Sequence, residues 1–256
     1  MSKRQRFIVT SAVLSLGFVG IALLEDRFRF LGIGGLGLLT ILLFAWSLRE
    51  GLGKNLTLLT FILPVFFTVG VGLFWFLLPT SIIARVPIVI LYGLGIYTLC
   101  LTSNIYIVAA IRTIALLRAA RGVGFVLTLV TFFLVFDAVL SIKANIFLTA
   151  GLIALLSYPL YLQGFWSVLL EKKLSREVLS QAIIASVIMG EIAFSMYFWP
   201  VTVVVGSLFF TVACYIMLGL GQARLEGRLF KQTTREYLLL GLLVFIGMFF
   251  ATRWGA

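Results

Sequence analysis

The feature that most restricts the fold of this chain is a series of long apolar runs, each near the ~20 residues that a helix needs to cross a bilayer. Only short gaps with charged residues separate the runs. We distinguish about nine of them, namely Phe7–Leu24, Phe30–Leu48, Leu56–Leu78, Val86–Ala110, Gly122–Ile142, Ala144–Trp166, Val178–Trp199, Val201–Leu220 and Tyr237–Thr252. Of the 256 residues, 62% are hydrophobic and 11% are charged, which is more apolar material than one water-soluble core of this size buries.

These runs predict helices, because a helix satisfies its backbone hydrogen bonds within the span and needs no partner strand. A transmembrane barrel would instead show short segments of alternating polarity, and the sequence has none. No long polar region interrupts the series. We therefore expect residues 1–256 to form a single all-α domain, a polytopic transmembrane helix bundle with no separate soluble domain. Lys143 and the Trp199–Pro200 pair leave room only for tight hairpins, although a re-entrant segment near Pro200 is the alternative.

The basic residues gather in alternate gaps. About 15 of the 20 Lys and Arg side chains fall on one side of such a threading, as the positive-inside rule describes for cytoplasmic loops. The richer side has Lys3, Arg4, Arg6, Arg49, Lys54, Arg112, Arg118, Arg121, Lys172, Lys173, Arg176, Arg224, Arg228, Lys231 and Arg235; the poorer side has Arg27, Arg29, Arg85, Lys143 and Arg253. This division predicts a cytoplasmic N-terminus, an external C-terminus and residence in the cytoplasmic membrane.

Several chemistries lack the residues that they need. The chain has no histidine, which removes the commonest general base and zinc ligand. Its two cysteines, Cys100 and Cys214, lie inside apolar runs, where a disulfide is not expected. We expect no metal site and no cofactor. The basic residues follow the membrane topology and do not form a soluble basic domain, so nucleic acid is not an expected partner.

Two acidic residues lie inside apolar runs, Asp137 and Glu191. At 1.5 Å per residue, Glu191 is ~12 Å and Asp137 ~9 Å from the predicted outer boundary, so the two lie at a similar depth. A charge there is costly unless it is paired, protonated or in contact with water. The two carboxyl groups could carry protons or hold a cation, or they could only link helices by hydrogen bonds. Asp137 could also pair with Lys143 or Arg85.

The run that holds Glu191 also has small residues at Ala182, Ser186 and Gly190, a spacing that allows two helices to approach closely. Ser180, Ile184 and Ser195 fall near the Glu191 face of the same helix. This pattern predicts that Glu191 is buried in a central helix of the bundle.

Other polar residues in the runs are candidates for a path or for hydrogen bonds between helices: Asn104, Tyr92, Tyr97 and Ser195. Two basic gaps are candidates for contact with anionic lipid headgroups, and they contain Arg112, Arg118, Arg121, Arg224, Arg228, Lys231 and Arg235. The last four would form one stripe if their segment were helical. The alternative is that these charges only set the topology.

The sequence therefore predicts one of three roles. We favour a non-catalytic membrane component, meaning a subunit, scaffold or lipid-contacting assembly factor that binds a second membrane protein, because the loops are short and the inner acids are few. The first alternative is a transporter or proton-translocating protein that uses Asp137 and Glu191. The second is an intramembrane enzyme, for which the sequence offers no catalytic motif.

Overall fold

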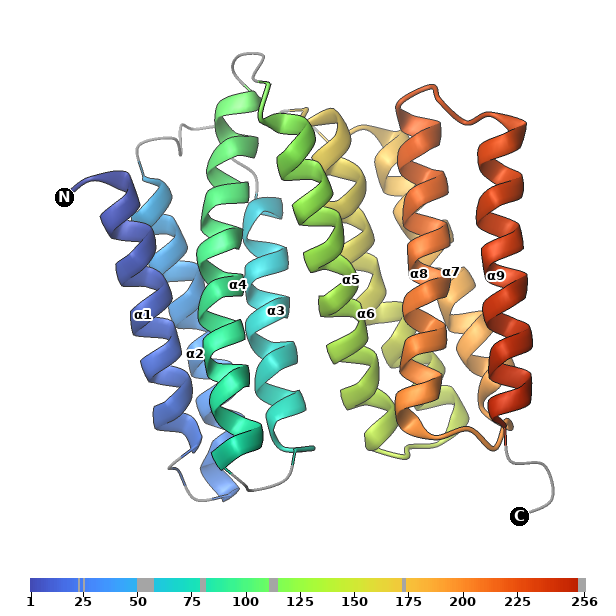
Figure 1. Cartoon of the computed structure of the whole chain (residues 1–256), viewed down its shortest axis with the longest axis horizontal. Helices are drawn as coiled ribbons and strands as arrows, with labels where there is room; N and C mark the ends of the chain where they lie inside the picture. The colour runs from blue at the N-terminus through green and yellow to red at the C-terminus, as the bar shows by residue number, and fades with distance from the viewer. Residues whose placement is uncertain are drawn as a thin grey trace. The chain divides into compact units, whose positions relative to one another are not determined.

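We describe a computed structural model of the chain for residues 1–22, 24, 26–49, 58–78, 82–110, 115–171 and 174–252. In these residues it contains nine α-helices and no strand, which confirms the all-α prediction (Figure 1). The helices are α1 (Lys3–Ala22), α2 (Asp26–Leu48), α3 (Leu59–Trp75), α4 (Ile82–Ala109), α5 (Leu117–Ser141), α6 (Ile146–Leu169), α7 (Arg176–Met196), α8 (Val203–Leu225) and α9 (Lys231–Ala251).

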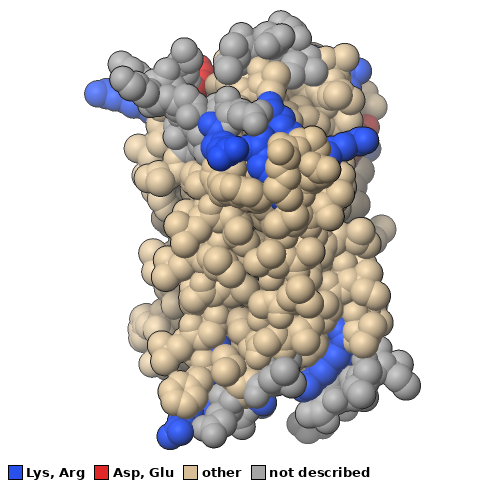
Figure 2. Space-filling view, turned by 90° about the vertical axis from the view of Figure 1, so that its left-hand side faces the viewer, with Lys and Arg blue, Asp and Glu red and all other residues tan. Residues whose placement is uncertain are grey.

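Seven of these helices, α2 and α4 to α9, are long and apolar enough to cross a membrane. The exceptions are α3, which is shorter at 17 residues, and α1, whose first turns carry Lys3, Arg4 and Arg6. Figure 2 shows one face of the molecule on which basic side chains lie at the two ends and uncharged surface lies between them. Both observations are those of an integral membrane protein, because charged side chains avoid the hydrocarbon layer.

The chain divides into two compact units, unit 1 from Met1 to Thr131 and unit 2 from Phe132 to Ala256. In unit 1, neighbouring helices run antiparallel and are joined by buried hydroxyl groups. Thr10 of α1 shares a 2.5 Å hydrogen bond with Ser47 of α2. Thr68 of α3 bonds both Thr40 of α2 at 3.2 Å and Tyr92 of α4 at 3.1 Å. These bonds connect four apolar helices at fixed positions.

In unit 2, α6 and α7 form a close antiparallel pair. A Cβ atom at Gly190 of α7 would lie only 3.0 Å from the Cβ atom of Ala154 in α6. The core beside this pair is aromatic and contains Phe132, Phe136, Tyr161, Phe165 and Phe210. Helix α9 packs against α8, where the Tyr237 ring lies tilted against the Tyr215 ring with centroids 5.2 Å apart. Most of the large apolar side chains of α9 are exposed.

The connections in unit 2 are short and well capped. Asn145, Ser175 and Thr202 cap α6, α7 and α8, and each side chain accepts a hydrogen bond from the backbone N–H three residues later. The turn at Trp199–Pro200 joins α7 directly to α8, so this segment is a tight connection between two long helices. Lys143, in the α5–α6 turn, has a left-handed backbone with φ of 53°.

Candidate functional site

Asp137 is buried in unit 2. It lies on α5 with 3% of its surface exposed, and it accepts a 3.2 Å hydrogen bond from the hydroxyl of Ser207 on α8. Ser207 is completely buried, and its hydroxyl also lies 3.0 Å from the carbonyl of Val204. The rings of Phe136 on α5 and Phe210 on α8 also contact each other, with centroids 5.8 Å apart. Asp137 therefore links α5 to α8, and the hydrogen-bond partner of its carboxylate within unit 2 is Ser207.

Glu191 differs from the sequence prediction, because its side chain is exposed on the surface of α7 and not buried. The residues that share its face are exposed as well: Ser180, Ile184, Val187, Phe194 and Ser195. The small-residue stripe lies on the other side of the helix, where Ala182 and Ser186 are buried. Helix α7 therefore has one packed face and one open face, and it is not the fully surrounded central helix that the sequence predicts.

The two intramembrane acids have different surroundings. Asp137 has a hydrogen-bond partner on α8, whereas the Glu191 carboxylate has no hydrogen-bond or ion-pair partner among the residues that the structure describes. Glu191 lies in a shallow groove between α6 and α7, which we call the α6–α7 groove and which is lined by Ala150, Ala154, Val187, Gly190, Glu191, Phe194 and Ser195. Asp137 does not line this groove. In the described part of the chain, no group of three or more His, Cys, Asp or Glu side chains could hold a metal ion.

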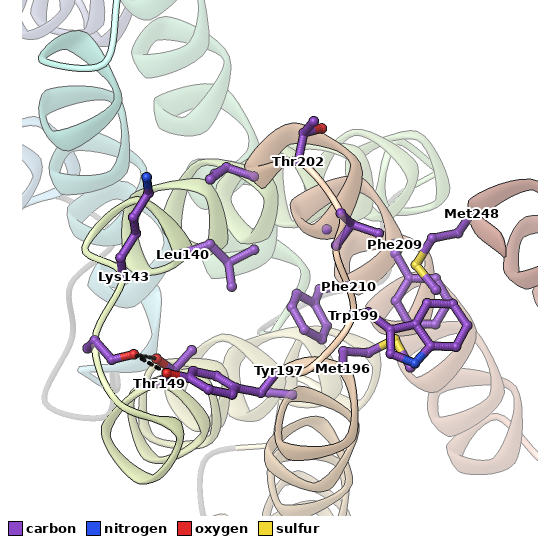
Figure 3. Close-up of a pocket in the computed structure, with 15 residues that line it drawn as sticks. Leu140, Lys143, Thr149, Met196, Tyr197, Trp199, Thr202, Phe209, Phe210 and Met248 are labelled. Atoms are coloured by element: carbon purple, nitrogen blue, oxygen red, sulfur yellow. Dashed lines mark hydrogen bonds between the residues drawn. The ribbon is translucent and has the colours of Figure 1, made fainter. Parts of the chain in front are cut away.

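A second concave feature lies where the α5–α6 and α7–α8 turns meet the end of α9, and we call it the end pocket (Figure 3). Its volume is about 290 Å³. It is lined by Leu140, Lys143, Ala144, Thr149, Ala193, Met196, Tyr197, Trp199, Val201, Thr202, Val203, Gly206, Phe209, Phe210 and Met248. Glu191 lines the α6–α7 groove but not the end pocket, and Asp137 lines neither of the two.

The polar groups of the end pocket are few. The Ala144 carbonyl accepts hydrogen bonds from the hydroxyl of Tyr197 at 3.1 Å and from that of Thr149 at 3.3 Å, which holds the α5–α6 turn against the end of α7 (Figure 3). Lys143 is the one charged residue of the lining. The sequence pattern did not predict this pocket. The signal for it was the occurrence of Lys143 and the Trp199–Pro200 pair in tight turns on the same predicted side of the membrane.

The basic candidates do not form a continuous helical stripe. Helix α8 ends at Leu225, and Gly227 follows with φ of +68°, a left-handed conformation that ends the helix. Arg224 therefore belongs to α8, Arg228 to the connection, and Lys231 and Arg235 to α9. All four side chains are exposed.

The remaining basic candidates lie in unit 1 or at its edge. Arg118 is exposed and Arg121 is half-buried in the first turns of α5, and Arg112 lies outside the described residues.

The four polar path candidates lie in both units, three on α4 of unit 1 and one on α7 of unit 2. Tyr92 is buried in unit 1, where its hydroxyl shares a hydrogen bond with that of Thr68 and its ring centroid lies 5.1 Å from that of Phe18. Tyr97 and Asn104, also on α4, are half-buried. Ser195 is exposed in unit 2, and its hydroxyl donates to the carbonyl of Glu191 in its own helix.

Comparison with known proteins adds one match. Residues 9–251 match a family model described as a protein of unknown function (DUF5656). The chain belongs to this family. No curated protein and no solved structure matches it. Because the match covers nearly the whole chain, both units belong to the region that defines the DUF5656 family.

Proposed function

We propose that this DUF5656 protein is a non-catalytic subunit of a membrane assembly, and that the α6–α7 groove is where a transmembrane helix of its partner binds. The observation that carries the proposal is the exposed carboxylate of Glu191 within the apolar helix α7. A carboxylate in contact with lipid chains would lose its hydration without gaining a partner. A partner helix that brings a hydrogen-bond donor to this position would remove that cost.

The groove suits a helix. Ala150, Ala154 and Gly190 have little or no side chain, so a partner backbone could approach closely, as small residues allow in membrane helix pairs. Phe194 and Val187 supply apolar contact on either side of Glu191. We infer that the partner helix carries Lys or Arg at this depth, because a cation both neutralises the carboxylate and donates hydrogen bonds to it.

We also propose that all nine helices cross the cytoplasmic membrane, with the N-terminus inside and the C-terminus outside. The alternation of basic gaps supports this topology. The packing of unit 1 supports counting α1 and α3 as spans. Ser11 of α1 donates a 2.6 Å hydrogen bond to the Gly93 carbonyl of α4, and Thr68 of α3 shares a hydrogen bond with Tyr92 of α4. Both α1 and α3 therefore lie beside α4, which is long and apolar enough to cross a membrane.

The test is photo-crosslinking in intact cells. A photoreactive amino acid replaces Ser195, which is exposed in the groove, and the control position is Leu243, which is 70% exposed on α9. We expect position 195 to form a discrete adduct with another polypeptide, and Glu191→Ala to abolish that adduct. Position 243 should give only lipid adducts. Lipid adducts alone at position 195, or an adduct that survives Glu191→Ala, would contradict the proposal.

A further inference from the structure

We propose that the end pocket of unit 2 binds an acyl chain of an anionic phospholipid, and that Lys143 pairs with the phosphate of this lipid. This site is separate from the α6–α7 groove, and the inference does not depend on the proposed function. It also differs from the places where exposed basic residues such as Arg224 and Arg228 lie, because those residues have a positive charge but do not line this pocket.

The apolar part of the site is built by several elements. Leu140 comes from α5, Phe209 and Phe210 from α8, Met248 from α9, and Met196 from the end of α7. Figure 3 shows Leu140 and Phe210 on facing sides of the space, with Met248 and Phe209 to the right. At about 290 Å³, the pocket is close to the lower limit of small-ligand sites, ~300 Å³, and so has room for part of a lipid rather than a whole one.

The charge of the lining selects an anion. Lys143 is exposed at the edge of the pocket, and no acidic residue occurs in the lining. Two helices also begin here, α6 after Asn145 and α8 after Thr202, and the N-terminal end of a helix carries a partial positive charge. A zwitterionic lipid would bring a second, positive group to the same place, so an anionic headgroup is the better match.

The position of the pocket explains why the ligand is a membrane lipid. It opens at the two short turns that end α5 and α7, whose preceding residues are apolar for the length of a bilayer span. Tyr197 and Trp199 in its wall are residue types that concentrate at the boundary between hydrocarbon and headgroups. Phospholipids place a phosphate at that boundary and an acyl chain below it, which matches an exposed Lys143 beside the apolar lining.

The test is native mass spectrometry of the full chain purified in mild detergent, with phosphatidylglycerol or phosphatidylcholine added at equal concentration. We expect the parent to retain one phosphatidylglycerol in preference to phosphatidylcholine. Lys143→Asn removes the charge but keeps a residue that tolerates a left-handed backbone. It should weaken phosphatidylglycerol retention about fivefold, the effect of one basic residue near a lipid surface, and remove the preference. Arg176→Asn, which removes an exposed charge at the start of α7, is the control and should change neither.

A second variant tests the apolar part. Val203→Trp enlarges a half-buried side chain of the lining and should reduce retention of both lipids. Thermal unfolding shows whether each variant is folded, and if Val203→Trp is not, Lys143→Asn decides alone. Equal retention of the two lipids by the parent, unchanged retention in Lys143→Asn, or full retention in folded Val203→Trp would each overturn the proposal.

Discussion

At the scale of single residues, the two intramembrane acids have opposite environments. Asp137 is enclosed by α5 and α8 and is held by Ser207, whereas Glu191 projects from the open face of α7. A buried carboxyl group with a hydrogen-bond partner is explained by the fold alone, because it links two helices. An exposed carboxylate in an apolar face is not explained in this way. This contrast is why we assign a structural role to Asp137 and a partner-binding role to Glu191.

The structural role of Asp137 predicts how its variants unfold. Asp137→Asn keeps the shape and the acceptor for Ser207, so its free energy of unfolding should stay within about 1 kcal/mol of the parent. Asp137→Ala removes the acceptor and leaves a small cavity, and should cost about 1–3 kcal/mol. Thermal unfolding of the purified variants in one detergent measures both. Equal destabilisation by Asn and Ala would show that the carboxylate charge itself is required, contrary to a structural role.

The sequence could locate both acids along the chain but not around their helices. In a soluble helix, polar residues mark the exposed face. Here α5 and α7 are apolar on both the packed and the open face, so the pattern does not separate the two. For α7 the small residues Ala182, Ser186 and Gly190 mark a side that the structure places against the bundle. Glu191 directly follows Gly190, and it lies far enough around the helix to leave that contact.

At the scale of helices, close approach through small residues determines how α6 and α7 pair. Gly190 lies against Ala154 and the backbone of Ala150, and a Cβ atom there would be 3.0 Å and 3.4 Å away from them. Such distances leave no room for a larger side chain unless the two backbones separate. The same pairing brings Ala150 and Ala154 to the edge of the α6–α7 groove. The groove and the helix contact therefore depend on the same residues.

This packing predicts a strong effect of Gly190→Leu. The added side chain must push α6 from α7, so we expect a loss of about 1–3 kcal/mol in stability and a lower yield of folded protein in detergent. Gly247→Leu is the matched control, because Gly247 on α9 has nothing within 4 Å of a Cβ position. Size-exclusion chromatography and thermal unfolding compare the two variants. If the two variants have the same yield and stability, then α6 and α7 pack less closely than the Gly190 distances indicate.

The sequence located the helices well but not their ends. Each apolar run overlaps one helix, because run length and the need to satisfy backbone hydrogen bonds leave a membrane segment few alternatives. The ends depend on local turn chemistry. A helix from Arg224 to Arg235 would have placed four basic residues on one stripe, but the left-handed Gly227 breaks it. The sequence placed the two tight turns of the end pocket on one side of the membrane, but it could not show that these turns and α9 come together to form a pocket.

At the scale of the whole molecule, the topology is the property that the charges predict and that cellular reporters can test. A nine-span chain places a reporter after Ala256 outside, and one in the α6–α7 connection inside. These two positions do not test α1 and α3, which are not among the seven helices of full length and hydropathy. Reporters after Leu24 and after Leu78 do so, because both positions are external only if α1 and α3 cross the membrane.

We therefore expect a secreted-phosphatase fusion to be active after Leu24, Leu78 and Ala256, and inactive in the α6–α7 connection. A fluorescent protein that folds only in the cytoplasm should give the opposite result at each position. The physical reason is the uneven distribution of Lys and Arg, of which Lys3, Arg4 and Arg6 begin the chain on the side that this distribution predicts to be cytoplasmic. Exchanging these three for Gln removes the charges that orient α1. Part of the protein should then place Leu24 on the opposite side and lower the activity of that reporter, while the activity of the Ala256 reporter stays unchanged. An active phosphatase at Leu24 with an inactive one at Leu78 would show that α3, with its 17 residues, does not span, and the chain would then cross the membrane fewer than nine times.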